Sequence, residues 1–300
     1  MTGFFVVSGV LLYGLLAVYI ERKLAAWVQD RRGPEETGPF GLLQTFADLL
    51  KLLRKAESIP ETAFKGAFLF APLLAFGAVI GTLAWIPAAE PNADHEYALW
   101  LAGATLSLEA VALLLGGWSS GSKYALLGAY RLLALLLAYE LILGLLFLTV
   151  LTHYGTLSFK AIVESQRTLW GLFQSPGLFM AGLIWVGAGL MVAHRAPFDL
   201  PETESELVAG TLTEYSGFRF ALFMLAEYCV MLFQAVWMSY VFFGGLLLLF
   251  TPCLILLQMI LRWTWPRWRP DQTLSLAWRK GIPLAFTAWI GELLWIRFST

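Results

Sequence analysis

The chain has 300 residues, of which 59% are hydrophobic and only 14% charged, and its mean hydropathy is +0.70. Soluble domains have about a quarter charged residues, so this composition indicates an integral membrane protein in a lipid bilayer. A net charge of −1 gives no basis for nucleic-acid binding. Cys229 and Cys253 both lie in apolar segments outside any C-x-x-C pattern. They are predicted to be small buried residues. A disulfide is not expected, and a zinc site or an iron–sulfur cluster needs more ligands than these two.

Eight apolar segments are long enough to cross a bilayer, which takes about 20 residues. The predicted spans are 3–26, 64–87, 98–117, 124–151, 177–194, 219–242, 244–262 and 281–297. The sixth and seventh are split at Gly244-Gly245, because about 40 apolar residues are too many for one crossing, and Pro252 offers a later turn or kink. The first segment has no basic n-region and no cleavage site, so we expect a retained span. The prediction is one all-α, polytopic membrane domain over residues 1–300.

Basic residues are distributed unevenly about these eight spans. Eight crossings put both termini on one side of the membrane, and the opposite side then holds 22–65, 118–131, 195–219 and 262–280. These four segments contain 17 of the chain's 20 Lys and Arg residues. The positive-inside rule makes that side cytoplasmic, or matrix in an organelle, and places both termini outside.

The first inner segment contains an amphipathic pattern. Gly33-Pro34 and Gly38-Pro39 interrupt the chain, and apolar residues then recur at helical spacing over 42–53, with polar residues on the remaining surface. This predicts a short helix lying at the membrane interface. One reading is a surface anchor. The other is a lining for a passage between lipid and an attached protein, with an apolar wall formed by Phe40, Leu43, Phe46 and Leu50.

Charged residues inside the predicted spans are rare and expensive, so they are functional candidates by default. Glu109, Glu140 and Glu227 lie within the third, fourth and sixth spans, and Arg131 lies near the inner end of the fourth. A structural reading pairs Arg131 with one acid to hold helices together. For the whole set, a proton or ion path is the favoured reading. Glu292 lies close to the outer end of the last span and is expected to reach water.

An acidic cluster follows the fifth span. Between Arg195 and the sixth span the chain places Asp199, Glu202, Glu204, Glu206 and Glu214. Asp199, Glu202 and Glu206 are spaced i, i+3, i+7, so they share one face if this segment is helical. The plain reading is helix capping and solvation. Because the cluster lies between two spans, we favour a functional role. His194 is a lone histidine at the end of a span and is predicted to be structural.

Long motifs over nearly the whole chain resemble one family. They include E-R-K at 21–23, Q-x-R-x-G-P at 29–34, G-W-S-S-G-S-K-Y-A-L-L-G-A-Y-R at 117–131, R-A-P-F-D-L-P-E at 195–202 and R-W-T-W-P-R-W-R-P-D-Q at 262–272. The chain is similar to the proximal membrane subunits of respiratory complex I, the proton-pumping NADH:quinone oxidoreductase.

The resemblance implies a subunit of this enzyme without its own redox centre. Its substrate would be a quinone such as ubiquinone, and its partners would be peripheral-arm subunits that contain the iron–sulfur clusters and flavin, together with other membrane-arm subunits. The expected location is a bacterial inner membrane, with an organellar membrane as the alternative. The expected quinone-chamber residues are Arg22, Gln29, Arg31, Phe40, Leu43, Phe46, Asp48, Arg195 and Phe198. The expected proton-coupling residues are Glu109, Arg131, Glu140, Asp199, Glu202, Glu204, Glu206, Glu214 and Glu227.

The chain departs from the family pattern at several positions. Val192 stands where the family usually has a glutamate, and His194 stands where it usually has an asparagine. Either His194, Glu140 and Glu227 then provide the missing proton link, or coupling is altered. Two alternatives stay open: the homologous membrane subunit of an energy-converting nickel–iron hydrogenase, and a stand-alone ion transporter. The buried acids argue against a purely structural anchor.

Overall fold

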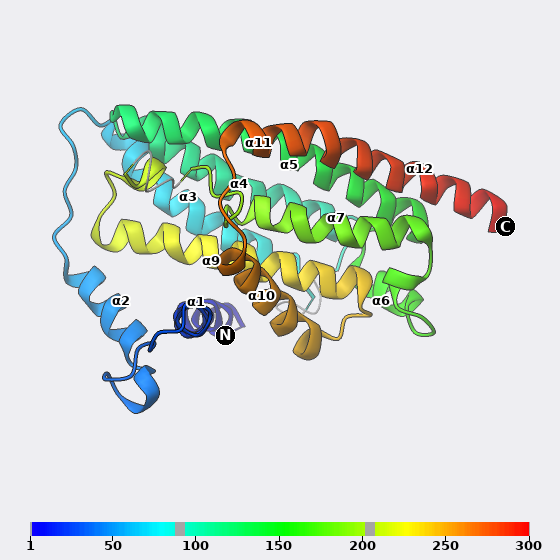
Figure 1. The fold of residues 1–300 in the computed structure, drawn as a ribbon, viewed down its shortest axis with the longest axis horizontal. Helices are drawn as coiled ribbons and strands as arrows, with labels where there is room; N and C mark the ends of the chain where they lie inside the picture. Colours follow the sequence, from blue (N-terminus) through cyan, green and yellow to red (C-terminus); the bar gives the residue numbers. More distant parts are fainter. Residues whose placement is uncertain (1, 88–93, 202–207, 300) are drawn as a thin grey trace.

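The computed structural model describes residues 2–87, 94–201 and 208–299, and the regular structure in these ranges is helical. Six helices form an elongated bundle (Figure 1). They are α3 (Lys65–Leu83), α4 (Ala98–Ser119), α5 (Lys123–Tyr154), α7 (Pro176–Val192), α9 (Gly217–Phe242) and α12 (Ile282–Ser299). The other α-helices of the described residues are α1 (Thr2–Val28), α2 (Gln44–Arg54), α6 (Phe159–Ser165), α10 (Leu247–Thr264) and α11 (Pro270–Leu276). The all-α prediction is confirmed for the described residues.

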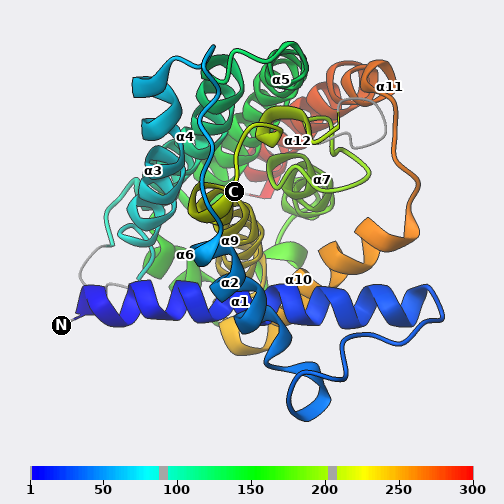
Figure 2. The same cartoon turned by 90° about the vertical axis from the view of Figure 1, so that its left-hand side faces the viewer.

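Five helices in the described part of the chain are long and apolar enough to cross a membrane: α3, α4, α5, α9 and α10. The apolar helix α7 is shorter, at 17 residues. These six coincide with six of the predicted spans. The predicted first and last spans are also helices, α1 and α12, but α1 lies across the bundle helices and not along them (Figure 2). The total of eight spans therefore stays a prediction.

Local sequence signals explain where these helices begin and end. Ser175 caps α7 by accepting a hydrogen bond from the Leu178 amide at 3.1 Å, and Pro176 occupies the first turn. Gly244 and Gly245 have φ values of 63° and 72°, a backbone conformation that favours glycine, and they form the turn between α9 and α10. The predicted split at this dipeptide is confirmed. Pro252, by contrast, lies inside α10.

The last span belongs to a longer helical run than expected. A π-helical turn over Ala277–Gly281 joins α11 directly to α12, so residues 270–299 form one continuous rod along α5 and α7 (Figure 1). The eight predicted spans place 262–280 in an inner connection. Most of this segment is helix, and only 265–269 is an extended link after α10.

Close packing at the end of the bundle holds the connection between α7 and α9 against α4 and α5. A Cβ added at Gly128 of α5 would lie 2.9 Å from the Thr211 amide nitrogen and 3.0 Å from the Pro201 carbonyl oxygen, so this position requires glycine. Tyr215 stacks on Phe68 with ring centroids 4.2 Å apart and donates to the Phe68 carbonyl at 3.0 Å. Burial raises the pKa of Tyr215 to about 12, so its hydroxyl remains a donor. The segment that begins at Arg195 is thereby fixed to the bundle.

Candidate functional site

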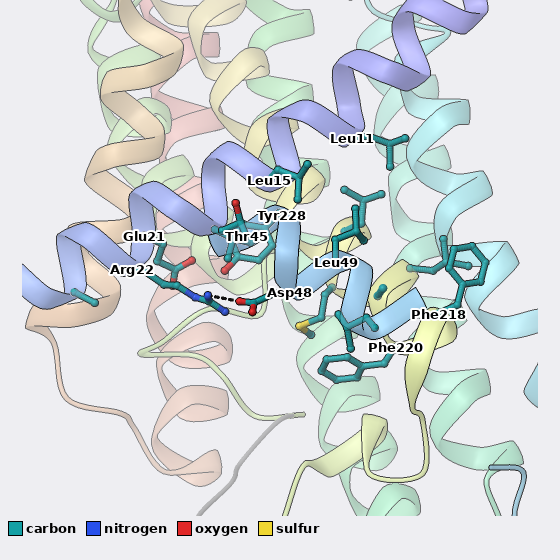
Figure 3. A pocket seen from close by; sticks show the side chains of 18 of the residues that line it. Leu11, Leu15, Glu21, Arg22, Thr45, Asp48, Leu49, Phe218, Phe220 and Tyr228 are labelled. Carbon is teal, nitrogen blue, oxygen red and sulfur yellow. Dashed lines mark hydrogen bonds and ion pairs between the residues drawn. The ribbon is translucent and has the colours of Figure 1, made fainter. Parts of the chain in front are cut away.

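A cavity of about 430 Å³ lies between α1, α2, α9 and the end of α10. Most of its lining is apolar, and its charged groups gather at one end (Figure 3). Leu11 and Phe218 lie at the apolar end, whereas Glu21, Arg22 and Asp48 lie together at the other. A concave, mostly apolar site of this size with a few convergent polar groups suits an amphiphilic organic ligand.

The polar end of the cavity is organised by ion pairs between helices. Arg22 Nη1 of α1 lies 2.5 Å from Asp48 Oδ2 of α2, and Gln44 orients the same carboxylate by donating to Oδ1 at 3.0 Å. Arg262, near the end of α10, donates to Glu21 of α1. Charge-assisted bonds of this kind fix three helices around one polar pocket. A headgroup with carbonyl oxygens would meet guanidinium donors at this end.

A buried ion-pair network leads inward from this cavity. Arg195 Nε lies 2.8 Å from Glu227 Oε1, and its Nη1 lies 3.9 Å from Glu21 Oε1. The Arg195 guanidinium also lies over the Tyr228 ring, 4.3 Å from its centroid. Glu21, Arg195 and Glu227 are each 4% exposed. Charges so deeply buried persist only when they are paired, so Arg195 connects the cavity wall to Glu227 in the bundle.

A second cavity of about 260 Å³ lies inside the bundle between α4, α5, α7 and α9. Glu109 and Glu140 both line it, and Ser107 donates to Glu140 Oε1. Gln234 also lines it and lies seven residues after Glu227 on α9, so the two share a helix face. The structure therefore places Glu109 and Glu140 on one cavity. Glu227 lies two helical turns from the cavity-lining Gln234 on α9.

Val192 and His194 lie beside this second cavity. Val192 lines it, so a longer side chain there would enter the space next to Glu140. His194 follows the end of α7 with a left-handed φ of 50°, a conformation in which Asn, Asp and His are enriched. Its ring meets Tyr139, which lines the same cavity, with centroids 6.1 Å apart.

Comparison with known proteins identifies the family. The model of the NADH dehydrogenase family matches residues 1–292. The H subunit of NADH-quinone oxidoreductase from Bacillus cytotoxicus is 40% identical, over 96% of this chain and 92% of that protein. An H subunit of the same enzyme from Cytophaga hutchinsonii is 34% identical over 97% of both chains, and that from Chlorobium luteolum is 37% identical over 97% of this chain and 86% of its own. The chain belongs to this family.

The side chains of α2 that line the first cavity are not the ones expected from the amphipathic pattern. Thr45, Asp48, Leu49 and Leu52 line the cavity. The side chains expected to form the wall lie outside that lining and are exposed: Phe40, Leu43, Phe46 and Leu50. An amphipathic pattern shows that a helix has an apolar face, but it does not show which stripe meets the protein and which meets lipid.

The remaining expected chamber residues lie in different places. Arg22, Arg31 and Asp48 line the cavity, whereas Gln29 lies beside it and accepts a hydrogen bond from Arg31 Nε at 2.7 Å. Arg195 lies behind the lining, in the ion-pair network described above. Phe198 is buried farther along the chain, where it meets the Trp268 ring edge-on at 5.7 Å.

The remaining proton-coupling candidates that the structure describes do not line either cavity. Asp199 Oδ2 lies 3.4 Å from Arg267 Nη2, which ties the loop to the link after α10. Glu214 is half-buried near the start of α9, and Arg131 is half-buried on α5, nine residues before Glu140. Glu202, Glu204 and Glu206 lie outside the described residues.

Two charged residues at the polar end of the first cavity were not among the expected candidates. Glu21 and Arg262 link α1 to α10 at the polar end of the cavity. A signal for both was present: Glu21 lies inside the first apolar segment, and Arg262 ends the seventh. Two opposite charges near the inner ends of predicted spans are candidates for a pair, because each is expensive in lipid alone.

Proposed function

We propose that this chain is the membrane subunit that forms the quinone chamber of a proton-pumping NADH-quinone oxidoreductase. The observation that supports this most strongly is the cavity between α1, α2, α9 and α10. Its apolar lining suits an isoprenoid tail, and the guanidinium groups at its polar end suit the carbonyl oxygens of a headgroup. The flavin and iron–sulfur clusters that deliver electrons would belong to peripheral-arm partners docked at this end.

The coupling route that we propose begins at the same polar end. A change in charge on the quinone would alter the electrostatic potential at Glu21. Glu21 and Glu227 both lie close to the Arg195 guanidinium, so the change would extend to Glu227. From Glu227, the α9 face leads to Gln234 and the cavity that contains Glu109 and Glu140. Buried charged groups at such close spacing interact strongly, so a proton gained at one carboxylate alters the next. Quinone reduction would in this way bias the protonation of carboxylates inside the membrane.

A photoreactive quinone provides the direct test. With the intact complex and an azido-quinone of natural tail length, we expect cross-links in the peptides that line the first cavity, namely residues 11–25 of α1, 45–52 of α2 and 218–228 of α9. An excess of unlabelled quinone should compete with the reagent. Cross-links confined to the exposed face of α2, around Phe46, would contradict a chamber at this position.

Subunit composition discriminates the remaining alternatives. Purification of the tagged chain from native membranes should yield iron–sulfur and flavin subunits together with other membrane-arm subunits. A nickel–iron module in their place would support the hydrogenase alternative. Isolation of the chain alone would support a transporter.

The proposed topology has eight spans with both termini outside, in a bacterial inner membrane. A helix of 27 residues is about 40 Å long, so α1 can cross a hydrocarbon core of about 30 Å even when strongly tilted. The amphipathic helix α2 would lie at the inner interface. The uneven distribution of Lys and Arg supports this orientation.

Cysteine labelling tests this orientation at two exposed acidic positions. In a variant without Cys229 and Cys253, Glu164→Cys, near the end of α6, should react with a membrane-impermeant maleimide added from outside intact cells. Glu61→Cys, before α3, should react only after the membrane is opened. The two positions lie on opposite sides in the eight-span topology, so the reverse pattern of labelling would overturn it.

A further inference from the structure

A buried pair of titratable groups lies outside the lining of both cavities described above. Glu292 of α12 is fully buried, although its position near the end of a predicted span suggested contact with water. Its Oε1 lies 2.7 Å from His153 Nδ1 at the end of α5, and its Oε2 accepts a hydrogen bond from Ser175, the N-cap of α7. Three helices and the short turn before α7 meet at this point, towards the C-terminal end of the chain (Figure 1).

A glycine in the first turn of α7 allows this helix to pack closely against Glu292 of α12. A Cβ added at Gly177 would lie 2.8 Å from the Ala288 carbonyl oxygen and 2.5 Å from Glu292 Oε2, so only glycine lets the first turn of α7 approach α12 this closely. Trp289 Nε1 donates to Thr152 Oγ1 at 3.0 Å and joins α12 to α5 next to His153. Because Ser175 is the N-cap of α7, the Glu292 carboxylate lies at the N-terminus of α7, where a negative charge is stabilised.

The hydrogen bonds around His153 determine where protons must be. Gln174 Nε2 donates to the carbonyls of Leu169 at 2.8 Å and Ser165 at 3.3 Å, which fixes the amide so that its Oε1 faces His153 Nε2 at 2.9 Å. A carbonyl oxygen only accepts, so Nε2 must bear a proton. The protonation of the second ring nitrogen is then decided by Glu292.

The contact between the ring and the carboxylate requires a second proton. Ser175 Oγ already accepts from the Leu178 amide, so its own proton points to Glu292 Oε2. The remaining oxygen, Oε1, faces Nδ1 at 2.7 Å. Two lone pairs cannot meet at this distance without a hydrogen between them. A single proton between Nδ1 and Oε1 also leaves the buried pair with no net charge, whereas its loss would leave an unpaired carboxylate in an apolar site.

We propose that His153 and Glu292, held by Gln174 and Ser175, form a proton-binding site that stores one exchangeable proton between the imidazole and the carboxylate. The His153 side chain is 17% exposed, so the proton has a path to solvent while Glu292 has none of its own. A shallow groove of about 320 Å³ borders Gln174 and Ser175 on the outer surface. This site is formed only by hydrogen bonds within the chain, so it does not rest on the proposed quinone function.

The other titratable and charged groups near this site do not replace either partner. Among the described residues, Tyr154 lies edge-on to the His153 ring with centroids 4.7 Å apart, and its hydroxyl donates to the Val241 carbonyl at 3.4 Å. Arg297 lies five residues after Glu292 on α12 and is exposed. The proton on the pair is therefore assigned to His153 and Glu292.

Nuclear magnetic resonance of the full chain in lipid bilayers tests this assignment, because the chain has only three histidines, His95, His153 and His194. With ¹⁵N-labelled histidine and ¹³C-labelled glutamate at pH 7, we expect His153 to show a protonated Nε2 and a proton shared between Nδ1 and Glu292. In Glu292→Gln, the shared proton should be lost and the ring should become neutral. The exposed His95 provides the reference in the same spectrum.

Assignment does not depend on a variant of the site itself. His95→Asn and His194→Asn remove the other two signals in turn, so the wild-type spectrum remains interpretable if a variant at position 153 or 292 does not fold. A wild-type His153 with an unprotonated Nδ1 beside an ionised Glu292 at pH 7 would overturn the proposal. An imidazolium signal that persists unchanged in Glu292→Gln would also overturn it.

Discussion

Replacing Leu49 with Asp is expected to reduce turnover with a long-tailed quinone by at least about tenfold. Leu49 lines the apolar part of the first cavity, where α2 faces α1 and α9. A carboxylate there must be desolvated when an isoprenoid tail binds, and about 1.4 kcal/mol of such a penalty already corresponds to a factor of ten in affinity. In the proposed chamber, a short-tailed quinone needs only its headgroup to reach Arg22 and Asp48, so turnover with it should fall much less. Steady-state assays of the complex with both substrates measure the difference.

Phe46→Asp is the matched control for this experiment. Phe46 lies on the same helix, only three residues earlier, but it is 50% exposed and lies outside the cavity lining. The same change in charge at this position should change turnover with the long-tailed and the short-tailed quinone by nearly the same factor. A larger loss in Phe46→Asp than in Leu49→Asp would mean that the tail follows the outer face of α2, as the amphipathic pattern alone suggested.

The helices of the bundle could be predicted from the sequence because each is set by strong local signals. Uninterrupted apolar runs, Gly244-Gly245 and the Ser175-Pro176 cap mark their limits, and each signal acts within a few residues. The orientation of α1 across the bundle was not predictable in this way. It depends on side chains far away in sequence, such as the pair between Glu21 and Arg262. Hydropathy describes the length of a helix but contains no information on its direction.

The site was predictable in its residue types and less so in its geometry. Intramembrane charges identified Glu109, Glu140 and Glu227 as candidates, and the structure places the first two on one cavity. Glu292 shows the limit of this reasoning. Its position near a span end suggested contact with water, but Gly177 lets α7 cover it and His153 pairs with it. Depth along one helix does not give burial, because burial is set by the neighbouring helices.

The replacement Glu140→Gln is expected to reduce quinone-linked turnover and proton pumping together while the complex still assembles. Glu140 lines the second cavity and accepts from Ser107, and a glutamine retains that acceptor but cannot titrate. Proton uptake in proteoliposomes and electron transfer measured on the same preparation give the two readouts, and native gels report assembly. Glu164→Gln, at an exposed position near the end of α6, is the control for loss of a carboxylate as such. Full pumping by Glu140→Gln would make this residue structural.

Val192→Glu provides a rescue of that variant. Val192 lines the same cavity as Glu140, so a glutamate there would place a new carboxylate in the space that Glu140→Gln leaves without one. We expect the double variant Val192→Glu/Glu140→Gln to regain most of the lost turnover and pumping, whereas Val192→Gln/Glu140→Gln, of nearly equal volume, should regain neither.

Combining Val192→Glu with Glu227→Gln tests whether the rescue is specific to this cavity. Glu227 pairs with Arg195 and lies outside the cavity lining. Removing one partner of a buried ion pair costs about 3–5 kcal/mol, since the other charge is left uncompensated. Val192→Glu should therefore fail to rescue Glu227→Gln, because its carboxylate enters the cavity and does not face Arg195. Rescue of Glu227→Gln but not of Glu140→Gln would reverse the order of the route. Rescue of neither would mean that a carboxylate at position 192 cannot replace the one lost at Glu140, which would argue against a proton link through this cavity.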